Sequence, residues 1–168
     1  MDKKTRSVTI SALLTALTVA FLCIAAVMPT GQLGIVSAAS LFTAAAVIES
    51  GPVSAAFVFA ASCALGAIIS PNKPLILLYA LFPGYYPIVK CFAERLKRKI
   101  AVWLIKLAAF NAALAVAWLT LGDLLFVSAR IELKAAIVFP AGSAVFILFD
   151  IGLTKLIGLY IARVAGRR

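Results

Sequence analysis

The sequence predicts an all-α protein, a single membrane domain over residues 1–168 in which six transmembrane helices form a bundle. Two observations lead to this fold class. Hydrophobic residues make up 64% of the chain and charged residues 13%, about half the charged fraction of an average soluble domain, and the mean hydropathy is +1.12. The apolar residues also form long segments, and basic residues gather in alternate connections between them.

Prolines, glycines and charge clusters divide the apolar segments, because these residues mark turns and helix ends. A helix needs about 20 predominantly apolar residues to cross a bilayer. The first segment follows a basic start and ends before Pro29, and the third begins at the Gly51-Pro52 pair. The segments lack the alternation of apolar and polar residues that a closed barrel requires. These signals predict six helices, over residues 7–28, 33–49, 52–70, 74–89, 100–121 and 135–163.

The fourth segment contains two prolines that predict a break. Pro83 and Pro87 each lack an amide donor and clash with the carbonyl group four residues earlier. We expect the freed carbonyl groups to be buried in protein or to face a cavity. Residues 90–99, which follow, predict a short amphipathic helix on the inner membrane surface, because Phe92 and Leu96 share a face and basic residues cluster at the end.

The basic residues predict that both termini lie in the cytoplasm. With the amino terminus inside, the basic clusters in residues 3–6, 90–99 and 163–168 all fall on the inner side, where membrane proteins carry an excess of Lys and Arg. The formal charge of +10 then reflects topology and attraction to anionic membrane lipid, and without a nucleic-acid-binding motif we expect no nucleic-acid partner. The remaining lysines and arginines lie outside or within helices: Lys73, Arg130 and Lys134 outside, Lys106 and Lys155 in helices.

Several kinds of chemistry have no support in the sequence. The chain has no histidine, and its three cysteines lie in or beside apolar segments, so we expect neither a metal site nor a disulfide framework. It also has no glycine-rich phosphate loop and no nucleophile elbow. We therefore expect no cofactor and no enzymatic activity, and any process driven by ATP needs a separate ATPase.

A ladder of small residues marks the first helix. Ala12, Ala16 and Ala20 repeat at a spacing of four, so they line one face of the helix as a shallow groove. Such faces let a second helix approach closely within a bilayer. Two interpretations stay open: the ladder packs against another helix of this protein, or it is a docking surface for a partner.

The chain resembles the substrate-binding S components of energy-coupling factor transporters, which import vitamins and related micronutrients into prokaryotic cells. The resemblance covers the whole chain and rests on its size, six predicted helices with both termini inside, the basic start at residues 3–6, the alanine ladder, and the small-residue stretch at 49–52. It implies a multi-pass protein of the plasma membrane. It also implies that Ala12, Ala16 and Ala20 dock against a transmembrane coupling subunit, and that separate ATPase subunits supply the energy. In the family the loop between the first two helices closes over an outer pocket; residues 29–32 are short for such a lid.

Polar and aromatic residues within the apolar segments supply candidates for a solute pocket. At 1.5 Å per residue, Asp150 lies about 20 Å in from Arg163 and Asn111 about 18 Å in from Lys99. At these depths the two can meet near the middle of the membrane, or just outside it, on adjacent helices. A polar group at this depth is by default either paired or functional. The candidate lining on the outer side is Gln32, Tyr79, Asn111, Trp118, Ser143 and Asp150.

Structural roles for the same residues stay open. Asp150 has a possible structural partner in Lys106, which is also placed to extend to the cytoplasmic headgroups. Trp118 and Tyr79 are also typical of aromatic anchors at the membrane interface. The alternative function is a membrane scaffold of the cell-envelope or cell-shape machinery that transports nothing. An enzyme acting on lipid has little support, because the intramembrane acid and lysines form no recognisable pair of nucleophile and base.

Overall fold

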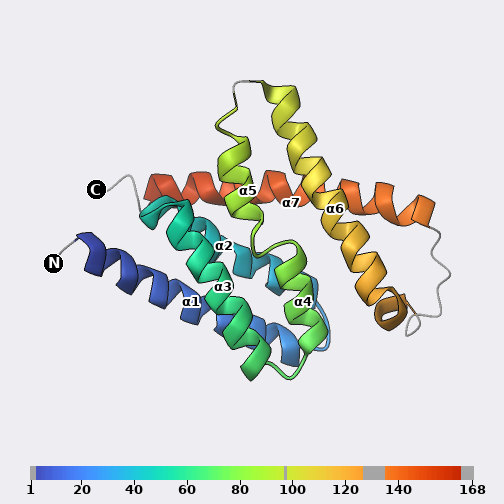
Figure 1. The fold of residues 1–168 in the computed structure, drawn as a ribbon, viewed down its shortest axis with the longest axis horizontal. Helices are drawn as coiled ribbons and strands as arrows, with labels where there is room; N and C mark the ends of the chain where they lie inside the picture. Colours follow the sequence, from blue (N-terminus) through green and yellow to red (C-terminus); the bar gives the residue numbers. More distant parts are fainter. Residues whose placement is uncertain (1–2, 97, 127–134, 164–168) are drawn as a thin grey trace.

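The computed structural model describes residues 3–96, 98–126 and 135–163, and the regular structure in these ranges is α-helical (Figure 1). Six spans in the described residues are long and apolar enough to cross a membrane, so the predicted fold class is confirmed. The basic residues Lys97, Arg130, Lys134, Arg167 and Arg168 lie outside the described residues. The helices are α1 (Lys3–Val27), α2 (Gln32–Ser50), α3 (Pro52–Ile69), α4 (Lys73–Leu81), α5 (Tyr86–Ala93), α6 (Lys99–Phe126) and α7 (Ala135–Arg163).

Both ends of the described chain lie close together at one side of the bundle (Figure 1). We call this the terminal side. Because α4 and α5 together form one span, the alternation of six spans also brings the α2–α3 turn and the α5–α6 connection to the terminal side. The α1–α2 and α3–α4 connections lie on the opposite side. That the terminal side faces the cytoplasm stays a prediction from the basic residues.

The first three helices form a close group, in which α1 packs against α2 and α3, and α2 packs against α3. Ala39, Ala46 and Ala55 are fully buried. Small side chains at these positions let the helix backbones approach, which increases the van der Waals contact that holds helices together within a bilayer.

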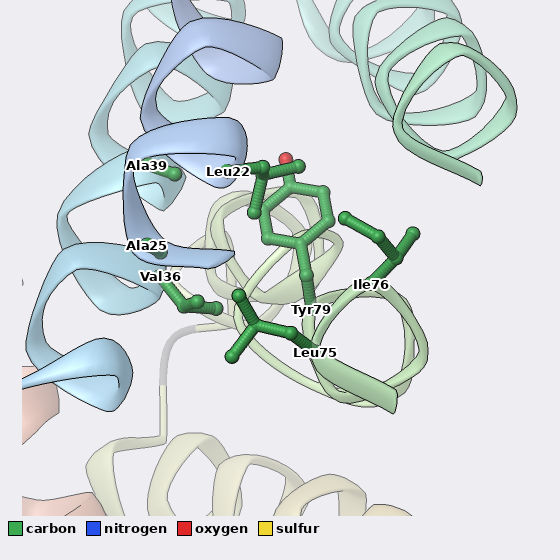
Figure 2. Packing of buried hydrophobic residues seen from close by; sticks show 7 residues of the cluster. All are labelled: Leu22, Ala25, Val36, Ala39, Leu75, Ile76 and Tyr79. Carbon is green, nitrogen blue, oxygen red and sulfur yellow. The ribbon is translucent and has the colours of Figure 1, made fainter. Parts of the chain in front are cut away.

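Tyr79 is the largest side chain in the cluster that joins α4 to this group (Figure 2). Its ring lies among apolar side chains from three helices, and its hydroxyl lies 3.2 Å from the Thr43 hydroxyl, so the polar end of the ring is hydrogen-bonded. The cluster consists of Leu22 and Ala25 from α1, Val36 and Ala39 from α2, and Leu75, Ile76 and Tyr79 from α4.

The fourth span is broken as predicted, into α4 and α5. Pro83 is buried and has no amide to donate, so the Gly84 amide donates to the Tyr79 carbonyl at 2.9 Å instead. The Tyr86 amide donates to the Phe82 carbonyl at 3.2 Å. These bonds satisfy carbonyl groups that the break would otherwise leave unpaired in an apolar surrounding.

The surface helix predicted for residues 90–99 is wrong. Lys90 and Ala93 are buried and belong to α5, residues 94–96 form a turn, and α6 begins at Lys99. Pro87 opens α5 within its first turn, where no amide donor is needed, and so does not break it. The segment therefore completes the fourth span, because its basic residue Lys90 has partners inside the bundle.

Helices α6 and α7 cover the remaining side of α2, α4 and α5. Aromatic rings dominate this interface. The Phe110 and Phe146 rings are stacked with centroids 4.8 Å apart, and Phe82 meets Phe110 edge to face at 4.9 Å. Tyr86 also lies against Phe146, at 5.3 Å between centroids. The aromatic layer thus links the break in the fourth span to α6 and α7.

We predict that Gly84→Ala destabilises the protein. A Cβ atom at this position would lie 2.7 Å from the Phe59 ring and 2.8 Å from the Tyr79 ring, closer than carbon atoms can pack. The overpacking should lower the free energy of unfolding by about 1–3 kcal/mol. Unfolding in detergent measures the change. In the control, Gly158→Ala on α7, the new atom meets nothing within 4 Å, so equal stability of the two variants would contradict the close approach at Gly84.

Candidate functional site

Three charged side chains are buried where α5, α6 and α7 meet. Lys90 comes from α5, Lys106 from α6 and Asp150 from α7, and each side chain is 5% exposed or less. The Lys90 Nζ atom lies 2.5 Å from Asp150 Oδ1, and the Lys106 Nζ atom lies 3.1 Å from Asp150 Oδ2. One carboxylate therefore joins three helices through two ion pairs. The possible pairing of Lys106 with Asp150 is confirmed.

Two hydroxyl groups complete the hydrogen bonding of this buried cluster. Tyr86 Oη donates to Asp150 Oδ1 at 2.5 Å, and Lys90 Nζ donates to Thr154 Oγ1 at 2.7 Å. Tyr86 precedes Lys90 by four residues and Thr154 follows Asp150 by four, so helix geometry brings each hydroxyl beside its charged neighbour. These hydrogen bonds are needed, because a buried charge is stable only when it is paired and hydrogen-bonded.

Glu94 lies at the edge of the cluster, with its side chain 48% exposed. Its Oε1 atom is 2.9 Å from Lys90 Nζ and 3.0 Å from Lys106 Nζ. Burial by itself would raise the pKa of Glu94, but hydrogen bonds from the two ammonium groups outweigh burial and hold its pKa below the ordinary value. Glu94 is therefore ionised at neutral pH and balances the second of the two lysine charges.

A cavity of about 520 Å³ lies beside this cluster, between the α5–α6 connection, the first turns of α6 and the second half of α7. We call it the charged cavity. Its polar wall is formed by Glu94, Lys106, Asp150, Thr154 and Lys155, and its apolar wall by Leu96, Val102, Trp103 and Ile151.

A second cavity of about 180 Å³ lies between α2, α4, α6 and α7, towards the start of α2 and hence towards the opposite side. We call it the apolar cavity. Ser37 is its polar contributor, and four phenylalanine rings form much of its wall. The lining is Leu33, Val36, Ser37, Leu78, Leu81, Phe82, Pro83, Phe110, Ala113, Leu114, Ala117, Val145, Phe146 and Phe149.

Three of the six predicted pocket residues, Tyr79, Gln32 and Asn111, are bonded to Thr43 or to a backbone carbonyl four residues earlier. Tyr79 is fully buried in the core of Figure 2. The Gln32 side chain donates from Nε2 to the Met28 carbonyl at 2.9 Å, and the Asn111 side chain donates from Nδ2 to the Leu107 carbonyl at 2.9 Å. These bonds give the three residues structural roles. A role in binding stays a prediction for all six.

The other three predicted residues lie on α6 and α7, where Trp118 and Ser143 are partly buried and Asp150 lines the charged cavity. Asp150 bonds to Lys106, which lies five residues, about 7.5 Å, closer to the terminal side of α6 than Asn111, and the Asn111 amide donates to the Leu107 carbonyl. Of the two cavities described above, the charged cavity is lined by Asp150 among the six predicted residues, and the apolar cavity by none of them.

Four residues that line the apolar cavity are direct sequence neighbours of predicted ones. They are Leu33, Leu78, Phe110 and Ala117, beside Gln32, Tyr79, Asn111 and Trp118. A step of one residue turns the side chain by about 100° around a helix. These lining residues therefore lie at the depth of the predicted ones along the helices, but which face points into the cavity depends on how each helix is rotated.

Lys90 is the residue of the buried cluster that the sequence analysis missed, because its position beside a basic run indicated a membrane surface. A signal was present. Tyr86, Lys90 and Glu94 repeat at a spacing of four, which aligns a hydroxyl, a cation and an acid on one face of a helix. Such a polar face at the end of an apolar span predicts a buried partner.

The alanine ladder lies on the surface of the bundle. Ala12, Ala16 and Ala20 are exposed, whereas Leu14 and Leu22 on the other face of α1 are buried. The interpretation that the ladder packs within this protein is therefore wrong for the described part of the chain. Helices α2 and α3 contact the opposite face of α1.

The comparisons with known proteins found no matching family model, no matching curated protein and no matching solved structure. Among the described residues, no group of three or more cysteine and acidic side chains is placed to hold a metal ion. The two cavities, the buried cluster and the exposed ladder are therefore the features of the described residues that bear on function.

We predict that Asp150→Asn strongly destabilises the protein. The substitution leaves Lys90 and Lys106 buried without the carboxylate they share, and breaking a buried ion pair in this way costs about 3–5 kcal/mol. Unfolding in detergent measures the loss. Lys155→Gln changes an exposed charge on the same helix and should alter stability by less than about 0.5 kcal/mol. Wild-type stability of the Asp150 variant would show that the cluster does not hold the helices together.

Proposed function

We propose that this protein is the solute-binding subunit of an importer of the energy-coupling factor type, in the plasma membrane of a prokaryote, for a vitamin or related micronutrient. The observation that carries this proposal is the exposed position of Ala12, Ala16 and Ala20. A strip of small residues that faces away from the bundle suits close packing against a helix of another protein. Its occupant is a transmembrane helix of the coupling subunit.

The apolar cavity supports solute binding. It lies towards the opposite side, which the basic residues predict to be outside the cell. Its volume of about 180 Å³ and its phenylalanine walls suit a small, flat, apolar ring, and the Ser37 hydroxyl is available to orient a polar substituent. The chain has no nucleotide-binding loop, so separate ATPase subunits drive release.

Ala16→Phe is expected to abolish association with the coupling subunit, because the added ring fills the groove that a partner helix must enter. The measurement is copurification of the tagged chain with coupling and ATPase subunits produced in the same cells. Ala64→Phe, at an exposed position of α3, is the matched control and should copurify normally. Association of the Ala16 variant at the wild-type level would refute docking through the ladder.

Ala117→Phe is expected to block solute binding while leaving that association intact. Ala117 lines the apolar cavity, and a ring at this position occupies the space that the solute needs. Native mass spectrometry of the detergent-purified chain should show at least about a tenfold drop in retained small molecule, equivalent to about 1.4 kcal/mol. Ala112→Phe, exposed on the same helix, controls for the added bulk. If both variants retain equal amounts, the solute binds elsewhere.

The scaffold function is the competing proposal, since an exposed ladder also suits a partner protein of the cell envelope. The apolar cavity favours the importer, because a scaffold needs no internal space for a solute. A vitamin-like compound released from the wild-type chain would support the importer. A chain that stays empty after its membranes are supplied with candidate vitamins would favour the scaffold.

A further inference from the structure

The buried part of the charge cluster carries an excess of positive charge. Lys90 and Lys106 share one buried partner, Asp150, and their second acid is Glu94, which is half exposed at the edge of the charged cavity. A half-exposed carboxylate keeps much of its hydration, so its hold on the lysines is weaker than that of a buried one. The position of the Glu94 carboxylate is therefore one that another anion can occupy.

The charged cavity adds a further cation. Lys155 lines it from α7, and the neighbouring turn carries Arg95. The formal charges of its two lysines, Lys106 and Lys155, balance those of its two carboxylates, so the wall has no net negative charge to repel an anion. Lys90, bonded to Asp150 behind this wall, makes the surroundings positive.

The opposite wall of the same cavity is apolar and reaches the surface of the bundle. Trp103 is 42% exposed, Ile151 44% and Leu96 46%. Leu96 and Trp103 lie near the terminal side, where the fifth span begins and basic residues cluster, and Ile151 completes this wall from α7. A phospholipid combines the two matching features, an anionic phosphate and an acyl chain, whereas a free phosphate matches the polar wall alone.

We propose that the charged cavity binds an anionic phospholipid. Its phosphate lies between Lys106 and Lys155, its acyl chain packs along Trp103 and Ile151, and Glu94 competes with the phosphate for Lys106. This site is separate from the solute cavity and from the alanine ladder, and it does not depend on the importer function.

The test uses the full chain, purified in detergent and mixed with dioleoyl phosphatidylglycerol or, at equal concentration, dioleoyl phosphatidylcholine. Native mass spectrometry counts the bound lipid. The wild-type chain should retain phosphatidylglycerol in preference to phosphatidylcholine. Lys155→Gln should reduce phosphatidylglycerol binding about fivefold, the effect of losing one cation near a membrane surface, without touching the buried ion pairs. Lys73→Gln, an exposed lysine at the opposite side, should bind like wild type.

Glu94→Gln is the more discriminating variant, because its expected effect is a gain. Removing the competing negative charge should raise phosphatidylglycerol binding severalfold. Three results would overturn the proposal. These are equal binding of the two lipids, equal losses for Lys155→Gln and Lys73→Gln, and full displacement of the lipid by an equal concentration of glycerol phosphate. The last result would mean that the cavity takes a free phosphate compound instead of a lipid.

Discussion

The second half of the bundle depends on the carboxylate of Asp150. Helix α5 is too short to cross a bilayer by itself, and it is separated from α4 by the break at Pro83. The ion pairs of Asp150 with Lys90 and Lys106 attach it to α6 and α7. Within an apolar surrounding these charges are tolerated only when they meet, so they restrict how the three helices can pack.

The break in the fourth span and the buried cluster depend on each other. Gly84 lies so close to the Phe59 and Tyr79 rings that only a residue without a side chain fits, and this holds the chain where α5 begins. From there Tyr86 both bonds Asp150 and packs against Phe146. The apolar cavity lies on the opposite side of the aromatic layer that contains Phe82, Phe110 and Phe146. The charged cavity lies on the terminal side of that layer.

The surfaces proposed for three kinds of partner are thereby carried by different parts of the bundle. The ladder belongs to α1, whose other face is occupied by α2 and α3. The apolar cavity is enclosed by α2, α4, α6 and α7, and the charged cavity by the α5–α6 connection, α6 and α7. A protein partner, a solute and a lipid would therefore bind without competing for the same side chains.

Local chemistry determined much of this fold from the sequence alone. Apolar length predicted six spans, Pro83 predicted the break, and the depth of Lys106 and Asp150 within their helices allowed their pairing. The tertiary structure decided how each helix is rotated about its axis and which side chains pair with one another. The apolar cavity is lined by Leu33 and Phe110 instead of Gln32 and Asn111, since a shift of one residue turns a side chain to another face. Lys90 is buried because Asp150, sixty residues later, lies beside it. Hydropathy depends on the residues of one segment, whereas helix rotation and ion pairing depend on all the helices that pack together.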